Sequence, residues 1–171
     1  MRKLLIVIDM QNDFITGPLG TPEAQDILPN VAAKIKEYRQ NGNEILFTRD
    51  THDDNYLSTQ EGQFLPVPHC IAGTAGHAIS SDLNTDNSEI LDKPNFGSIA
   101  LARKVADGNY SEIELCGLCT DICVVSNALI LKAQLPETRI SVDSHCCAGV
   151  TVDSHKAALL TMKMCQVNII E

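Results

Sequence analysis

The segment over residues 112–125, EIELCGLCTDICVV, restricts the possible folds of this chain more than any other segment. Its first five residues alternate between polar and apolar before Gly117, which predicts a strand that ends abruptly. Thr120 or Asp121 is well placed to cap a following helix. Cys123 would then lie in the first turn of that helix, where the helix dipole favours a thiolate over a thiol. Ligands bind beyond the strand ends of open α/β sheets, so a cysteine nucleophile is the first hypothesis.

The remaining segments indicate that this strand belongs to an α/β sheet. Apolar runs and alternating patterns predict further strands over residues 3–8, 44–48, 89–91, 139–142 and 167–170. Strands that alternate with helices predict a doubly wound, mostly parallel sheet of five or six strands, with helices on both faces in a Rossmann-like three-layer sandwich. A length of 171 residues, 44% of them hydrophobic, suits a single domain over residues 1–171.

Helices are predicted between these strands from apolar spacing and capping residues. They cover residues 26–40 and 98–105, the segment after the nucleophile turn, and a segment capped by Thr151 or Asp153. Residues 73–83 predict a turn and a short helix. In the last helix, we expect the core-facing side chains to be Ala157, Leu160 and Met164.

Three residues in separate segments predict a nucleophile system. Asp9 closes the first strand, Lys93 follows the strand over residues 89–91, and Cys123 begins the helix after the central strand. Because the carboxyl ends of parallel strands meet at one edge of a sheet, the three side chains can gather there. The lysine would favour the thiolate and the carboxylate would move protons. Taken alone, Asp9 is better explained as a turn residue at a strand end, and Lys93 as a solvated loop charge. His145 stays open as an imidazole partner of the cysteine.

The long irregular segment over residues 49–69 collects acidic and histidine residues. Such a segment in a compact domain is more often functional than accidental. Asp50 and His52 would point the same way in an extended chain, and with Glu61 and His69 they make a shell of two imidazoles and two carboxylates suited to Zn, Mn or Fe. On spacing alone, a solvated acidic loop explains these residues better.

Charge and cysteine content argue against several classes of function. A net charge of −9 argues against nucleic acid and anionic membranes as partners. The apolar run at residues 4–8 is too short for a signal peptide, and no run approaches the length of a membrane span. Seven cysteines, an odd number without a secretory signal, argue against a disulfide framework and indicate a reducing cytoplasm.

Three motifs, in order along nearly the whole chain, resemble those of the isochorismatase-like cysteine hydrolases, and among them the nicotinamidases. They are IDMQNDF at residues 8–14, the lysine motif with Lys93-Pro94 and FGS at residues 96–98, and GLCTDICV at residues 117–124. The resemblance implies that Asp9, Lys93 and Cys123 are the catalytic residues. It also implies a cis peptide between Leu118 and Cys119, and an oxyanion hole made by the backbone N–H groups of Cys119 and Cys123.

The resemblance further implies a divalent metal ion that anchors a pyridine nitrogen, and no organic cofactor. Its expected ligands are Asp50, His52, Glu61 and His69, with zinc the first expectation and manganese or iron as alternatives. Glu61 would replace the histidine that many nicotinamidases carry at the position of Ser58. The chain contains no tryptophan, so Phe14, Tyr56, Phe64 and Leu118 are expected to form the wall of the substrate pocket.

The predicted activity is that of a cysteine amidohydrolase of the nicotinamidase type, which converts nicotinamide and water into nicotinate and ammonia through a thioester on Cys123. One alternative is a metal-independent hydrolase of another small amide, such as an N-carbamoyl or ureido compound. Another is a redox or binding module without amide turnover, with reversible oxidation at Cys119, Cys146 or Cys147. The expected partners are a small-molecule amide and, because family members often form oligomers, further copies of the same chain.

Overall fold

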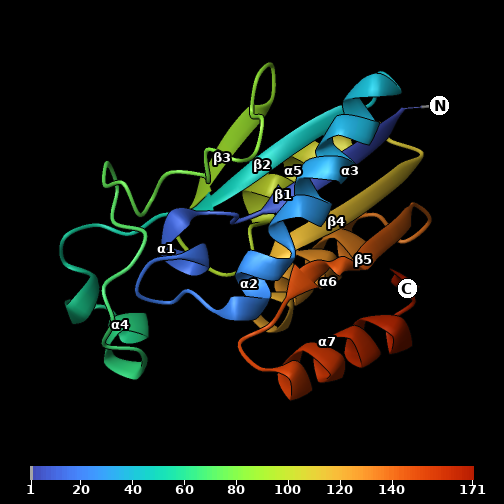
Figure 1. Ribbon diagram of the computed structural model, residues 1–171. Coiled ribbons are helices and arrows are strands. Elements are labelled where there is room, and N and C mark those ends of the chain that lie inside the picture. Colours follow the sequence, from blue (N-terminus) through green and yellow to red (C-terminus); the bar gives the residue numbers. More distant parts are fainter. Residues whose placement is uncertain (1) are drawn as a thin grey trace.

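A six-stranded parallel sheet forms the centre of the computed structural model, which describes residues 2–171 (Figure 1). The strands are β1 (Lys3–Ile8), β2 (Glu44–Asp50), β3 (Glu89–Lys93), β4 (Glu112–Leu118), β5 (Arg139–Ala148) and β6 (Asn168–Ile170). Their order in the sheet is β3-β2-β1-β4-β5-β6, and every neighbouring pair is parallel. This arrangement confirms the predicted doubly wound sheet, whose order reverses between β1 and β4.

Helices cover both faces of the sheet, as Figure 1 shows. The α-helices are α1 (Asn12–Ile15), α2 (Pro22–Asp26), α3 (Leu28–Gln40), α4 (Gln60–Phe64), α5 (Ile99–Asp107), α6 (Val125–Gln134) and α7 (Val152–Met164). Packing of α3 against β1, β2 and β5 closes one face, whereas α5, α6 and α7 pack on one another in sequence. Among the described residues, every helix falls short of the length and apolar character needed to cross a membrane.

Burial on both faces explains the apolar composition of β1, which lies where the strand order reverses. Five of its six side chains, from Leu4 to Ile8, are buried. A strand covered by helices on both sides must be apolar throughout because neither face meets water. The chain direction then places the first polar residue, Asp9, at the carboxyl edge of the sheet, where it is fully buried.

Gly117 allows β4 to approach β1 closely at the same edge. Its φ is +118°, and a Cβ atom at this position would lie 2.1 Å from the carbonyl oxygen of Ile8. Any side chain would therefore push apart the two strands that carry Asp9 and the Cys123 turn. The strand that the sequence predicts to end at this glycine continues one residue further, to Leu118, and the glycine permits the close contact within it.

Replacement of Gly117 with alanine is expected to lower the free energy of unfolding by at least about 2 kcal/mol. An unfavourable backbone conformation costs roughly 1–3 kcal/mol, and here the collision with Ile8 adds to it. Urea denaturation followed by circular dichroism measures the loss. Gly42→Ala is the matched control, because Gly42 also has a positive φ of 67° but nothing within 4 Å of its added Cβ. Equal losses for the two variants would contradict the close-contact explanation.

Three local predictions are wrong. Residues 73–83 form no helix, because the segment instead bonds to the chain after β1: Ala78 O accepts from Asn12 N, and Ser80 N donates to Met10 O. Strand β5 continues past residue 142 to Ala148, because it pairs with the end of β4. The core-facing residues of α7 are Ala158 and Met162, and the expected face is exposed.

Candidate active site

Side chains from three strand ends and one helical turn meet at the carboxyl edge of the sheet. Asp9 follows β1, Lys93 is the last residue of β3, and Cys123 lies in a π-helical turn, η2 (Thr120–Val124), between β4 and α6. The Lys93 ammonium lies 2.6 Å from Asp9 Oδ2 and 3.5 Å from Cys123 Sγ. Asp9 and Lys93 are fully buried, and Cys123 is buried with 4% exposure. The structure therefore brings the three predicted catalytic residues into direct contact.

Thr48 orients the Asp9 carboxylate. Its hydroxyl donates to Asp9 Oδ1 at 2.6 Å and accepts from the Asp9 backbone N–H at 3.3 Å. Asp9 itself has a φ of +47°, a left-handed conformation that turns the chain sharply after β1. One carboxylate oxygen is thus held by a neutral hydroxyl, and the other faces Lys93. Thr48 carries no sequence signal beyond its place in a strand, so sequence reasoning missed it.

Burial and the Lys93 charge act in opposite directions on the pKa of the Cys123 thiol. Burial raises the pKa of the Cys123 thiol well above its ordinary value, and the neighbouring Asp9 carboxylate adds to the increase, which Lys93 opposes. Burial also raises the pKa of Asp9, although the Lys93 charge opposes this change. Burial thus opposes the thiolate that Lys93 and the helix dipole favour, and Asp9, the group that would accept the thiol proton, lies in the same buried cluster.

The nucleophile turn is anchored by side chains outside it. Neither Thr120 nor Asp121 caps the helix, as the sequence had suggested; Cys119 occupies the N-cap position without a side-chain bond. The Thr120 hydroxyl instead lies 2.8 Å from His155 Nδ1, and the Asp121 carboxylate accepts from Val150 N at 3.1 Å. The peptide between Leu118 and Cys119 is cis, as the resemblance implied.

Asn127 joins the nucleophile turn to the loop that follows Lys93. Its side-chain amide donates to Cys123 O at 2.8 Å and to Phe96 O at 2.9 Å, and its oxygen accepts from Ser98 N at 2.9 Å. All three of these hydrogen bonds join the Asn127 amide to backbone groups of the segments that carry Lys93 and Cys123. Asn127 is one helical turn after Cys123, and its spacing alone gave no sign of this role.

Beside Asp9, Lys93 and Cys123, four residues gather with the chemistry of a metal site. Asp50, His52, Glu61 and His69 each offer a ligand atom, and these atoms lie within 4.8 Å of one another. His52 Nε2 is 2.8 Å from Asp50 Oδ2, and His69 Nε2 is 3.7 Å from Glu61 Oε1. His69 Nδ1 is engaged by Val67 O at 2.8 Å, which leaves Nε2 for a ligand role. This set of two imidazoles and two carboxylates fits a divalent ion such as zinc.

Asp50 belongs to both groups of residues. Its Oδ2 faces the two histidines, whereas its Oδ1 lies 3.4 Å from Lys93 Nζ. Burial alone would raise the pKa of Asp50, but hydrogen bonds from His52 and His69 and the charge of Lys93 hold that pKa well below its usual range. The carboxylate is therefore ionised in the folded protein and available to a cation.

A cavity of about 770 Å³ opens over both groups. Phe14, Phe64 and Leu118 line it together with Cys119, Cys123 and the four candidate metal ligands. Tyr56 does not line it. This tyrosine is 1% exposed, its ring centroid lies 4.7 Å from that of His52, and its hydroxyl donates to Leu65 O. It supports the histidines from behind, so its predicted place in the pocket wall is corrected.

His145 is an exposed residue of β5 and is not among the residues that line the cavity. The structure therefore gives no support to an imidazole partner for Cys123 at this position.

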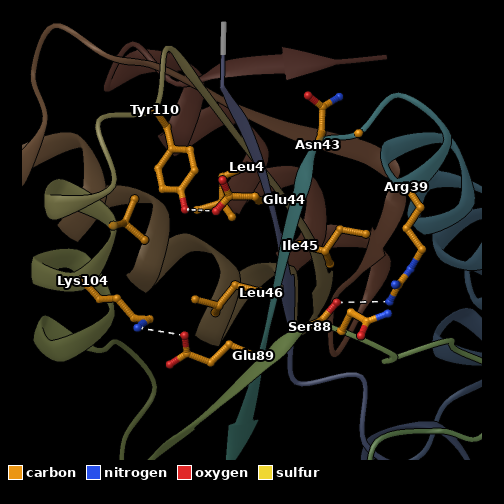
Figure 2. A pocket seen from close by; sticks show the side chains of 13 residues that line it. Leu4, Arg39, Asn43, Glu44, Ile45, Leu46, Ser88, Glu89, Lys104 and Tyr110 are labelled. Carbon is orange, nitrogen blue, oxygen red and sulfur yellow. Dashed lines mark hydrogen bonds and ion pairs between the residues drawn. The ribbon is translucent and has the colours of Figure 1, made fainter.

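A second cavity, of about 510 Å³, lies at the opposite edge of the sheet and is shown in Figure 2. It is lined by the first residues of β2 and β3, Glu44 and Glu89. Charged groups there are paired: Lys104 with Glu89 at 2.8 Å, and Tyr110 donating to Glu44 at 2.6 Å (Figure 2). None of its lining residues is a cysteine or a histidine, so the chemistry belongs to the larger cavity.

Comparison with known proteins agrees with this geometry. A model of the isochorismatase domain matches residues 3–171. The chain belongs to the isochorismatase family. Within the family, it is 30% identical to the uncharacterized isochorismatase family protein PncA of Bacillus subtilis (strain 168), over 93% of each chain.

Solved structures of the family superimpose on the whole chain. The crystal structure of nicotinamidase/pyrazinamidase PncA from Bacillus subtilis has a TM-score of 0.86 and 28% identity, with 100% of both chains covered. The pyrazinamidase of Pyrococcus horikoshii, crystallised in complex with zinc, has a TM-score of 0.86 and 26% identity, covering 100% of this chain and 99% of that chain. The similarity to the isochorismatase family thus includes the sheet edge that carries the candidate site.

Proposed function

We propose that this protein is a cysteine amidohydrolase that converts nicotinamide and water into nicotinate and ammonia. The observation that carries the proposal is the buried contact of Lys93 with Asp9 and Cys123. Cys123 lines the same cavity as four residues that could hold a metal ion. Relatives named nicotinamidase or pyrazinamidase support the choice of amide. The proposed single domain over residues 1–171 is supported by the single sheet, whose six strands come from residues 3 to 170.

The first half of the reaction forms a thioester. Asp9 accepts the proton of the Cys123 thiol, and the sulfur attacks the carboxamide carbon. Backbone N–H groups of Cys119 and Cys123 stabilise the negative oxygen of the tetrahedral intermediate. Asp9 then returns the proton to the amide nitrogen, the C–N bond breaks, and ammonia leaves. The raised pKa of Asp9, which burial causes, suits a group that must accept and release a proton in each cycle.

The second half of the reaction hydrolyses the thioester. Asp9 removes a proton from an incoming water molecule, whose oxygen attacks the acyl carbon, and the C–S bond breaks to release nicotinate and regenerate the thiol. Lys93 keeps its charge throughout, because burial lowers its pKa less than Asp9, Cys123 and Asp50 raise it. Its ammonium compensates the negative charge that moves between the carboxylate and the sulfur.

A divalent ion in this site would be held by Asp50, His52, Glu61 and His69. When bound, it would supply a Lewis-acidic position for the pyridine nitrogen of the substrate. Phe14 and Phe64 line the same cavity, so the pyridine ring would lie against aromatic walls in place of the absent tryptophan.

Removal of divalent metal is expected to abolish ammonia release from nicotinamide, and add-back of zinc, manganese or iron is expected to restore it. The physical reason is that the ring would lose its anchor while Cys123 stays intact. An ammonia assay on purified, reduced protein before chelation, after it and after add-back tests the proposal. Turnover that survives complete metal removal would instead favour the metal-independent hydrolase. No turnover in metal-loaded protein would overturn nicotinamide as the substrate.

A further inference from the structure

We propose that Gln11 and Asp13 are positioning residues that set the metal affinity of the four-ligand cluster. The inference rests on the metal site of the proposed function and assigns a role to the polar residues between Asp9 and Phe14. These residues belong to the first family-like motif, yet only its first aspartate and its phenylalanine have a place in the cavity or its chemistry. Neither Gln11 nor Asp13 lines the cavity.

Gln11 binds the backbone of the ligand Asp50 on both sides. Its side-chain oxygen accepts from Asp50 N at 2.7 Å, and its amide nitrogen donates to Asp50 O at 2.9 Å. The same nitrogen donates to His77 O at 2.9 Å. Gln11 is fully buried, so these bonds face no competition from water. Gln11 thus binds the peptide group before Asp50 and the peptide group after it. These bonds fix the direction in which the Asp50 side chain points from β2.

Asp13 acts on the other ligand-bearing stretch. Its Oδ2 accepts from the backbone N–H of Cys70 at 2.7 Å, directly after the ligand His69. Space for this carboxylate depends on two glycines: a Cβ atom on Gly76 would lie 2.1 Å from Asp13 Oδ1, and one on Gly17 would lie 2.6 Å from the same oxygen. Two separate segments therefore lack side chains where the Asp13 carboxylate sits.

The two ligand-bearing stretches also join each other. His52 N donates to Cys70 O at 3.0 Å, and Ala72 N donates to His52 O at 2.8 Å. Gln11 holds one side of this junction and Asp13 holds the other. The three ligands Asp50, His52 and His69 therefore depend on one short segment for their relative placement. Removal of a group that hydrogen-bonds a metal-ligand residue typically lowers metal affinity by roughly 10–100-fold.

The test measures zinc affinity by competition with a chromogenic chelator for the full chain and three variants. Gln11→Met and Asp13→Ala are each expected to weaken binding by roughly 10–100-fold. The conservative Asp13→Asn keeps an acceptor oxygen and is expected to recover much of the affinity lost in Asp13→Ala. Asn12→Ala is the matched control from the same segment, because the Asn12 side chain donates to Ala75 O, away from the ligand-bearing residues. Its zinc affinity is expected to equal that of the wild type.

Thermal unfolding separates positioning from a general structural role. Zinc raises the melting temperature of a protein that binds it only when folded, so the zinc-induced increase should shrink in Gln11→Met and Asp13→Ala. A structural role alone would lower the melting temperature of the metal-free variants but leave the zinc affinity of the folded protein unchanged. That second result would overturn the inference while the proposed function stands. Failure of the wild type itself to bind zinc, manganese or iron would instead overturn the metal site of the proposed function.

Discussion

Replacement of Cys123 with alanine is expected to reduce ammonia release from nicotinamide by about 10⁴-fold or more, the size of effect that loss of a catalytic nucleophile produces. The Cys123 sulfur is the atom that would form the covalent bond, and it is the thiol in contact with Lys93. Initial rates of ammonia release measure the loss. Intact-protein mass spectrometry after rapid acid quench should show an acyl adduct on the wild type and none on the variant.

Cys165→Ala is the matched control for this experiment, because Cys165 is an exposed thiol at the end of α7. It should retain the wild-type rate and the wild-type adduct. Substantial turnover in Cys123→Ala would rule out a covalent mechanism on this residue, even if the control behaves as expected. Loss of turnover in both variants would show instead that the assay reports on damage to the protein and not on the nucleophile.

Replacement of Lys93 with methionine is expected to abolish activity and to lower the free energy of unfolding by about 3–5 kcal/mol. Lys93 is fully buried and lies 2.6 Å from Asp9 and 3.4 Å from Asp50, so its removal leaves two carboxylates without their compensating cation. Methionine has a similar length, which limits the contribution of an empty cavity to the loss. Urea denaturation of metal-free protein measures the change without any contribution from a bound ion.

The pH dependence of this loss has a definite sign. Burial raises the pKa of Asp9 and the Lys93 charge opposes this change, so without Lys93 the pKa of Asp9 in the folded protein would lie still further above its value in the unfolded chain. A carboxyl group whose pKa is raised in the folded state makes the protein less stable as pH rises. The loss of unfolding free energy in Lys93→Met should therefore be smaller in mild acid than at neutral pH. Lys104→Met is the matched control, because Lys104 forms a partly exposed ion pair with Glu89 and should cost about 1 kcal/mol or less. Equal losses of unfolding free energy in Lys93→Met at neutral and mildly acidic pH would show that an unpaired buried carboxylate is not their cause.

Residues that end strands were predictable from the sequence. Each strand shows an apolar run or an alternating pattern, and parallel strands in a doubly wound sheet must end at one edge. Asp9 and Lys93 could therefore be placed beside the turn that carries Cys123, and the structure has them in contact. Asp50 and His52 follow the same rule. In the case of Glu61 and His69, spacing alone favoured a solvated loop, and only the resemblance pointed to a metal site.

Residues whose roles depend on tertiary contacts were not predictable. Tyr56 is as typical of a pocket wall as of a buried support, and only the packing of its ring against His52 decides between them. The buried face of α7 was misassigned because apolar residues lie on more than one side of that helix; Met162 is buried, whereas Leu160 is 61% exposed. Asn127 donates to Cys123, 4 positions before it, and to Phe96, 31 positions before it. No local sequence pattern encodes the second of these contacts.

The reversal of strand order between β1 and β4 also bears on how the enzyme acquires activity as it folds. Asp9 follows β1 and Cys123 follows β4; these two strands are neighbours in the sheet but are separated in the chain by β2, β3 and the helices between them. Such non-local pairing closes late because the intervening loop must lose its entropy first. No fragment that ends before β4 contains Cys123, the proposed nucleophile. Recovery of turnover during refolding would thus report on the docking of β4 against β1 and not on the formation of any single βαβ unit.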